Sequence, residues 1–281
     1  MVSLVALGLA GLMRPGLAAE VELPGASQLE TEIPVATQLG GREIYHRYLE
    51  NKLRSLEEHL MLISSDPGGH DQVSELLLRW KDYRDPNDRP TEGVTTKTAV
   101  RFLEPFDVRR TAYLIIGHED RPHDQFIYLP SLDHVRRVNL RGVGLMGTEY
   151  TIDDLVFQTL EDARYQRMPD DQVGGRPTYV VRARMNPGFR TRYPEVTIYA
   201  DREHYVPLRI LFYDSSGDLA REYRANPESV EDFDGVWIAT QATMTNLREG
   251  TTTTLIIEDL APNPPIKDSF FQAWRLDTGW E

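Results

Sequence analysis

Apolar and polar residues alternate along most of the chain after residue 70, which is typical of β-strands with one apolar and one charged face. The pattern is clear at Leu76, Leu78 and Trp80, and it returns at Val100 and Phe102. Turn signals such as "DSSGD" and "REG" separate the runs. Further strands are predicted at 111–117, 124–130, 134–140, 177–185, 194–200, 207–213, 218–224, 235–247 and 251–260.

Residues 42–63 have a helical period instead. Their apolar side chains recur at steps of four and three, at Leu49, Leu53, Leu56, Leu60 and Ile63. This spacing predicts one amphipathic helix, closed by the turn "DPGG" at 66–69. Short helical turns are expected near 151–156 and 268–274.

The strand pattern predicts a mainly β (α+β) fold. About eleven strands joined by short turns form an antiparallel sheet, because parallel strands need crossover helices. A sheet of this size tends to curl, so we expect a barrel or an open half-barrel. The helices are too few to cover its apolar face, which would leave a concave apolar surface for a ligand. We expect one domain over 41–281, after a flexible arm at 20–40.

The first nineteen residues are typical of an export signal. An apolar run from Val2 to Met13 is followed by Arg-Pro-Gly and by Ala18 and Ala19. The run is shorter than the roughly 20 residues that span a bilayer. Because no positive residue precedes it, either the start lies upstream or the run is a buried helix. The mature protein is expected to be soluble and extracytoplasmic.

Composition excludes several classes of function. The net charge of −13 argues against nucleic acid as a partner, since such binding depends on neutralising phosphates. The absence of cysteine excludes disulfides, thiolate catalysis, Zn–Cys sites and an acylated lipoprotein cysteine. We expect no cofactor.

Two polar clusters are candidates for chemistry. His118, Glu119, Asp120, His123 and Asp124 could hold a divalent metal, although a polar hairpin turn explains them more simply. "YLPSLDH" at 128–134 contains serine, aspartate and histidine, but neighbours in a strand point to opposite faces and no GxSxG elbow exists. Neither cluster predicts an enzyme.

The stretch "GVGLMGTEYTIDDL" at 142–155 resembles a phosphate loop, but no GxxxxGK[ST] pattern is present. Asp153 and Asp154 could act as paired carboxylates. The simpler interpretation is that Thr151 caps a short helix and Asp154 closes a capping box. A group of arginines, Arg109, Arg110, Arg136, Arg137 and Arg141, is either a solvated face or an anion-binding rim.

The order of several motifs resembles the outer-membrane lipoprotein-sorting-like proteins of the LolA-like family. These motifs are "FLEPFDVRRTAYL" (102–114), "DQFIYLPSLDHVRRV" (124–138), "LMGTEYTIDDL" (145–155), "RILFYDSSGDLAREY" (209–223) and "FDGVWIATQATMTN" (233–246). The resemblance covers roughly residues 75–260. It implies an incomplete antiparallel β-barrel whose helices cover the open side, as in periplasmic carriers that bind acyl chains and often work beside inner-membrane transporters of the RND superfamily.

The resemblance leads to a specific functional hypothesis. We expect a monomeric, non-enzymatic periplasmic carrier of a lipid or lipoprotein, with residues 42–63 as a lid; a sensor or adaptor that binds a protein partner is the alternative. Arg109, Arg136, Arg137 and Arg141 would meet the head group. The residues expected to line the acyl-chain cavity are Leu76, Leu78, Trp80, Val100, Phe102, Tyr113, Ile115, Phe126, Tyr128, Met146, Tyr179, Val181, Ile198, Ile210 and Phe212.

Overall fold

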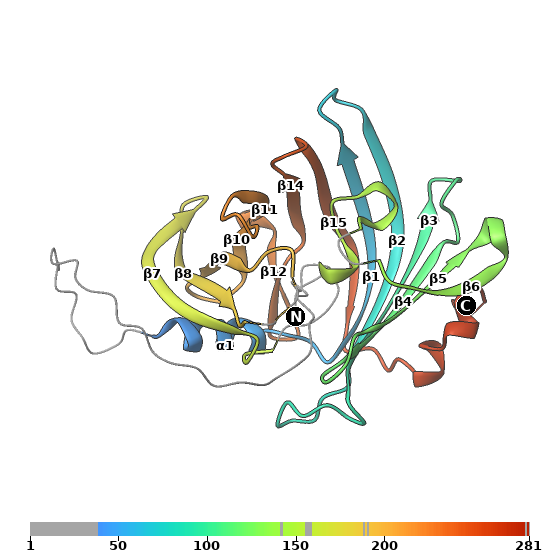
Figure 1. Ribbon diagram of the computed structural model, residues 1–281, viewed down its shortest axis with the longest axis horizontal. Helices are drawn as coiled ribbons and strands as arrows, with labels where there is room; N and C mark the ends of the chain where they lie inside the picture. Colours follow the sequence, from blue (N-terminus) through green and yellow to red (C-terminus); the bar gives the residue numbers. More distant parts are fainter. Residues whose placement is uncertain are drawn as a thin grey trace, which may run out of the picture.

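The protein consists of one large antiparallel sheet and one α-helix (Figure 1). This computed structural model describes residues 39–140, 143–154, 159–187, 189, 191–278 and 280. The predicted export signal and nearly all of the arm lie outside the described residues. Helix α1 spans Gly41–Glu50. The sheet contains β1 (Ser55–Ser65), β2 (Asp71–Asp82), β3 (Val94–Glu104), β4 (Ala112–His118), β5 (Asp124–Leu129), β6 (His134–Val138), β7 (Ala163–Val173), β8 (Arg176–Met185), β9 (Glu195–Asp201), β10 (Pro207–Tyr213), β11 (Leu219–Ala225), β14 (Gln241–Asn246) and β15 (Thr251–Pro262).

The remaining elements are short. Strands β12 (Val230–Phe233) and β13 (Val236–Ala239) form a separate hairpin. The six 3-10 turns that are described are η1 (Pro130–Leu132), η2 (Leu145–Gly147), η3 (Ile152–Asp154), η4 (Pro227–Ser229), η5 (Asp268–Phe270) and η6 (Ala273–Arg275). Within the described residues, no helix is both long and apolar enough to cross a membrane.

The strand order places the first and last strands of the chain side by side in the middle of the sheet. The order is β6-β5-β4-β3-β2-β1-β15-β14-β11-β10-β9-β8-β7, so β1 pairs with β15, and β6 and β7 are the two edges (Figure 1). The other neighbours are joined by hairpins or by longer loops, and all pairs are antiparallel. The predicted antiparallel, mainly β architecture is confirmed.

The predicted helix over 42–63 is wrong beyond Glu50, because β1 begins at Ser55. Leu56, Leu60 and Leu62 point to one face of this strand and are fully buried. A step of four fits a strand as well as a helix, since every second residue of a strand shares a face. Pairing with β2 and β15 on both sides decides in favour of the strand.

Two other parts of the strand prediction need correction. Strand β7 was missed, since its sequence ARYQRMPDDQV is largely polar and contains a proline, as edge strands tolerate. The segment 235–247 is not one strand: β13 belongs to the separate hairpin, and β14 belongs to the large sheet. Strand β12 occupies a stretch for which no strand was predicted.

Helix α1 is attached to one end of the sheet. It packs on β7 and β8, and the Tyr45 ring stacks on Tyr165 with centroids 4.4 Å apart. A Cβ on Gly41 would lie 2.7 Å from the Arg167 backbone nitrogen, so only glycine permits this approach. Directly after the helix, the Asn51 side chain makes two hydrogen bonds with the backbone of Trp237 in β13, of 2.8 and 2.9 Å.

Both faces of the sheet bury apolar side chains. The inner face, which carries Leu76, Leu78 and Phe102, forms the main core. The outer face of β3 to β5 is covered by the C-terminal segment, residues 263–278 and 280. Its side chains Phe271, Leu276 and Trp280 pack against Ala99, Ala112, Leu114 and Tyr128. The expectation of one apolar and one hydrated face therefore fails for this part of the sheet.

Candidate ligand-binding face

The inner face of the sheet gathers most of the side chains that were predicted to line a cavity. Those buried together in the main core are Leu76, Leu78, Trp80, Val100, Phe102, Tyr113, Ile115, Ile198, Ile210 and Phe212. Val181 is 1% exposed and pairs in register with Ile198. Met146 is partly buried against the same core. They come from strands in both halves of the sheet, so a single apolar surface extends across the β1–β15 pair.

Three of the predicted residues lie elsewhere. Phe126 and Tyr128 point to the outer face and pack near the C-terminal segment, whereas Ile127 and Leu129 of the same strand face the inner core. Both faces of β5 are apolar, so alternation alone did not identify the inner one. Tyr179 stacks on Tyr205, with centroids 5.8 Å apart, at the α1 end of the sheet.

A carboxylate that sequence reasoning missed also lies on the inner face. Glu58 of β1 is 0% exposed and pairs in register with Leu78 on one side and Leu260 on the other. Because residues 42–63 were predicted to be helical, Glu58 was not assigned to a face of the sheet. In a strand, the shared parity of Glu58 with Leu56 and Leu60 places it on the inner face.

A segment from Gly144 to Asp154, named the covering segment here, crosses the inner face near β14, β15 and β1 (Figure 1). Leu145, Tyr150 and Ile152 are buried in the main core, each at most 1% exposed. The Tyr150 hydroxyl donates to the carbonyl of Ala242 at 3.4 Å. Burial, followed by the nearby Tyr223, raises the pKa of Tyr150 well above its usual value.

Polar bonds attach the covering segment to β15. The backbone nitrogen of Glu149 donates to Thr253 Oγ1 at 2.8 Å, and Thr251 Oγ1 donates to the Glu149 carboxylate at 2.5 Å. The apolar contacts beneath the segment have no directional preference, whereas these hydrogen bonds fix the position of the segment along β15.

An ion pair attaches the covering segment to β11. Arg221 Nη2 lies 3.2 Å from Asp154 Oδ2 and also donates to the Glu149 carbonyl; both charged side chains are 5% exposed. The guanidinium carbon is 5.4 Å from the centroid of the Phe212 ring. Burial lowers the pKa of Arg221, but the charge of Asp154 and its hydrogen bond, together with Tyr193 and Glu149, outweigh this effect, so this pKa lies above its usual value.

The glycines and the aspartate of this segment have structural roles. A Cβ on Gly144 would lie 2.0 Å from the Thr148 carbonyl oxygen, and Gly147 has a φ of +84°. The backbone nitrogen and hydroxyl of Thr151 both donate to Asp154 Oδ2, at 2.7 and 2.8 Å. Only the half of the predicted capping box in which Asp154 accepts from the Thr151 backbone is present, because the Asp154 backbone nitrogen donates to the Thr151 carbonyl and not to its hydroxyl. The ion pair with Arg221 was not predicted.

The predicted head-group arginines are not brought together. Arg109, beside the β3–β4 turn, pairs with Glu104. Arg137, on the outer face of β6, pairs with Asp124. Arg136 is exposed on the other side of that strand. Arg141 lies outside the described residues.

The two clusters considered for catalysis are ordinary turns. Residues 119–123 connect β4 to β5, where Asp124 accepts from His118 Nε2 at 3.0 Å and from Arg121. In the part of the chain that the structure describes, no group of three or more His, Asp or Glu could hold a metal. Ser131 and His134 are exposed, and Asp133 accepts a hydrogen bond from Tyr128 at 3.2 Å.

The sequence and the fold each match known proteins. Residues 94–278, more than half of the chain, match a family model described as "Uncharacterized protein". The chain belongs to this family. No curated protein matches the sequence.

Solved structures show that this family member has a LolA-like fold. An outer membrane lipoprotein-sorting protein domain from Vibrio parahaemolyticus is 24% identical, with a TM-score of 0.74 over 84% of this chain and 98% of that one. A DUF1329 family protein from Desulfovibrio piger is 19% identical, with a TM-score of 0.76 over 84% and 97%. A LolA superfamily protein from Nitrosomonas europaea is 17% identical, with a TM-score of 0.64 over 84% and 98%. The resemblance seen in the sequence is confirmed at the level of fold.

Proposed function

We propose that the protein is a non-enzymatic, monomeric carrier in the periplasm that binds the acyl chains of a lipid or lipoprotein on the inner face of its sheet. It would transfer this cargo between the membranes of the envelope, beside an inner-membrane transporter of the RND type. The apolar surface that extends across both halves of the sheet is the observation that supports this proposal.

The chemistry of the inner face suits an acyl chain. Each methylene moved from water to an apolar surface contributes about 0.8 kcal/mol, so a long chain could supply several kcal/mol after the cost of ordering. In a LolA-like fold such a surface would form the concave side of an incomplete barrel.

Binding would require the covering segment to move. Leu145, Tyr150 and Ile152 now occupy the space above the strands, and an acyl chain would replace their contacts with similar ones. The hydrogen bond to β15 and the ion pair with β11 would be present when the segment covers the face and broken when cargo is bound, so the exchange would have two distinct states. The covering segment, rather than a long helix at 42–63, is then the lid.

Native mass spectrometry of protein purified from membrane-bearing cells tests the proposal. We expect a lipid or lipopeptide mass that is retained in the gas phase and released by organic extraction. Protein that is empty after every preparation, and that fails to bind a fluorescent fatty acid, would contradict it. Capture of a peptide with indifference to lipid would instead support the sensor or adaptor hypothesis.

A crosslink tests the role of the covering segment. The chain has no cysteine, so Glu149→Cys with Thr251→Cys introduces the only two thiols. A short bis-maleimide that joins them should reduce fatty-acid uptake, because the segment could no longer leave β15. The same protein treated with a monofunctional maleimide is the control and should still bind. Equal uptake by both forms would exclude this segment as the lid.

A further inference from the structure

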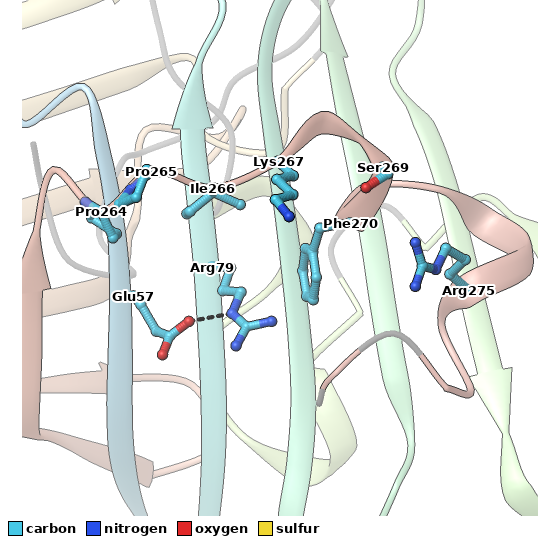
Figure 2. Close-up of a pocket in the computed structure, with 9 residues that line it drawn as sticks. All are labelled: Glu57, Arg79, Pro264, Pro265, Ile266, Lys267, Ser269, Phe270 and Arg275. Atoms are coloured by element: carbon cyan, nitrogen blue, oxygen red, sulfur yellow. Dashed lines mark hydrogen bonds and ion pairs between the residues drawn. The ribbon is translucent and has the colours of Figure 1, made fainter.

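A pocket lies on the outer face of the sheet, where the C-terminal segment crosses β1 and β2 (Figure 2). Its volume is about 410 Å³, within the range of small-molecule sites. Glu57 and Arg79 form its floor and are direct partners across the β1–β2 pair. Ile266 and Phe270 contribute to its walls.

Arg79 is held in one orientation. Its Nε atom donates to the Glu57 carboxylate, and its guanidinium carbon lies 4.3 Å from the centroid of the Phe270 ring. In Figure 2 the Nε atom of Arg79 faces Glu57, whereas its two terminal nitrogens have no marked interaction with that carboxylate and one of them points toward Phe270. These nitrogens can donate two parallel hydrogen bonds to a phosphate or carboxylate.

Two more cations face the pocket without a carboxylate partner. Within the described part of the chain, neither Lys267 nor Arg275 lies within ion-pair distance of an acid, whereas the nearby Lys81 pairs with Asp268 at 2.7 Å. In Figure 2 the Lys267 amine and the Arg275 guanidinium both point toward the side of Phe270. Both cations therefore remain available to an anionic ligand, although the net charge of the chain is −13.

The charges indicate the class of ligand. Three cations and one carboxylate leave a net charge of +2 in the pocket. A phosphate monoester carries about −1.5 to −2 at neutral pH and has three acceptor oxygens. The volume exceeds the need of inorganic phosphate, and Ile266 and Phe270 offer apolar contact to a substituent. We propose that this pocket binds a phosphate monoester with an apolar organic group.

Calorimetric titration with phenyl phosphate tests the proposal on the full chain. We expect phenyl phosphate to bind, inorganic phosphate to bind more weakly, and phenol not to bind. Lys267→Gln and Arg275→Gln should each weaken binding by about tenfold or more, as expected for a lost hydrogen bond between charged groups. Arg164→Gln, which removes an exposed charge from the distant edge strand β7, is the matched control and should have no effect.

A third variant separates binding from damage to the fold. Glu57→Gln removes the competing carboxylate, so it should tighten phenyl phosphate binding, which a folding defect would not do. The proposal would be overturned if millimolar phenyl phosphate did not bind, or if the Lys267→Gln and Arg275→Gln variants bound it with the affinity of the unmodified protein.

Vesicles distinguish the source of the phosphate group. Co-sedimentation with phosphatidic acid vesicles, but not with phosphatidylcholine vesicles, would identify a lipid head group if Arg275→Gln abolishes it. Binding of phenyl phosphate without vesicle binding would identify a soluble ligand. The pocket lies on the face opposite the acyl-chain surface, so this result does not depend on whether the carrier proposal holds.

Discussion

Removal of Arg221 should destabilise the protein strongly, because the substitution leaves the Asp154 carboxylate buried without its cation. In Arg221→Met the apolar stem keeps its contacts, whereas the ion pair with Asp154 and the bond to the Glu149 carbonyl are lost. Breaking one partner of a buried pair costs about 3–5 kcal/mol. At about 2–4 °C per kcal/mol for a domain of this size, the Tm should fall by about 6–20 °C.

Urea unfolding followed by circular dichroism measures this loss. Arg184→Met is the matched control, since Arg184 pairs with Glu195 at 2.6 Å but is 62% exposed, and such pairs contribute about 0–1 kcal/mol. Asp154→Asn and the double variant complete a double-mutant cycle. The cost of the double variant should be smaller than the sum by about 1–3 kcal/mol. A loss below about 1 kcal/mol in Arg221→Met, or additive single effects, would refute the buried pair as the anchor of the covering segment.

Three further predictions concern other parts of the fold. The hydrogen bond from Arg121 holds the pKa of Asp124 below its usual value, so the stabilising effect of Asp124 is present above about pH 4 and is lost as the pH falls through the folded-state pKa. Asp124→Asn should therefore make the fall of Tm below about pH 4 shallower than in the unmodified protein, and an unchanged pH dependence of Tm would contradict this. Gly144→Ala should displace the covering segment, since its Cβ would meet the Thr148 carbonyl, and hydrogen exchange of residues 145–154 should rise while β2 stays protected; unchanged exchange would contradict this. Phe271→Ala should cost about 3–5 kcal/mol in unfolding experiments and yet leave fatty-acid binding by the folded protein intact, because the side chain packs on the outer face.

Sequence periodicity predicted most of the sheet because its strands follow the alternation of buried and exposed residues. Periodicity failed where strand pairing or solvent exposure, rather than the local apolar pattern, determines the structure. The β1 segment has leucines at steps that suit both a helix and a strand, and only its pairing with β2 and β15 decides between them. The edge strand β7 has little apolar pattern, since much of it faces solvent.

The candidate site was predictable only in part. Inner-face positions such as Phe102 and Ile210 follow from alternation, and ten of the predicted lining residues share one core. The link between Arg221 and Asp154 joins positions 67 residues apart, and nothing in the local sequence of either indicates the other. The outer pocket depends on the path of the C-terminal segment, which no periodic pattern describes.

Glu57 and Glu58 show how much depends on strand register. They are adjacent and identical in chemistry, but Glu57 binds Arg79 in the outer pocket, whereas Glu58 is fully buried in the inner core. Pairing of β1 with β2 assigns the two faces, since a shift of one residue would exchange every side chain between them. Both proposed ligand sites therefore use side chains of β1 and β2, and a change in the β1–β2 register would disrupt both of them.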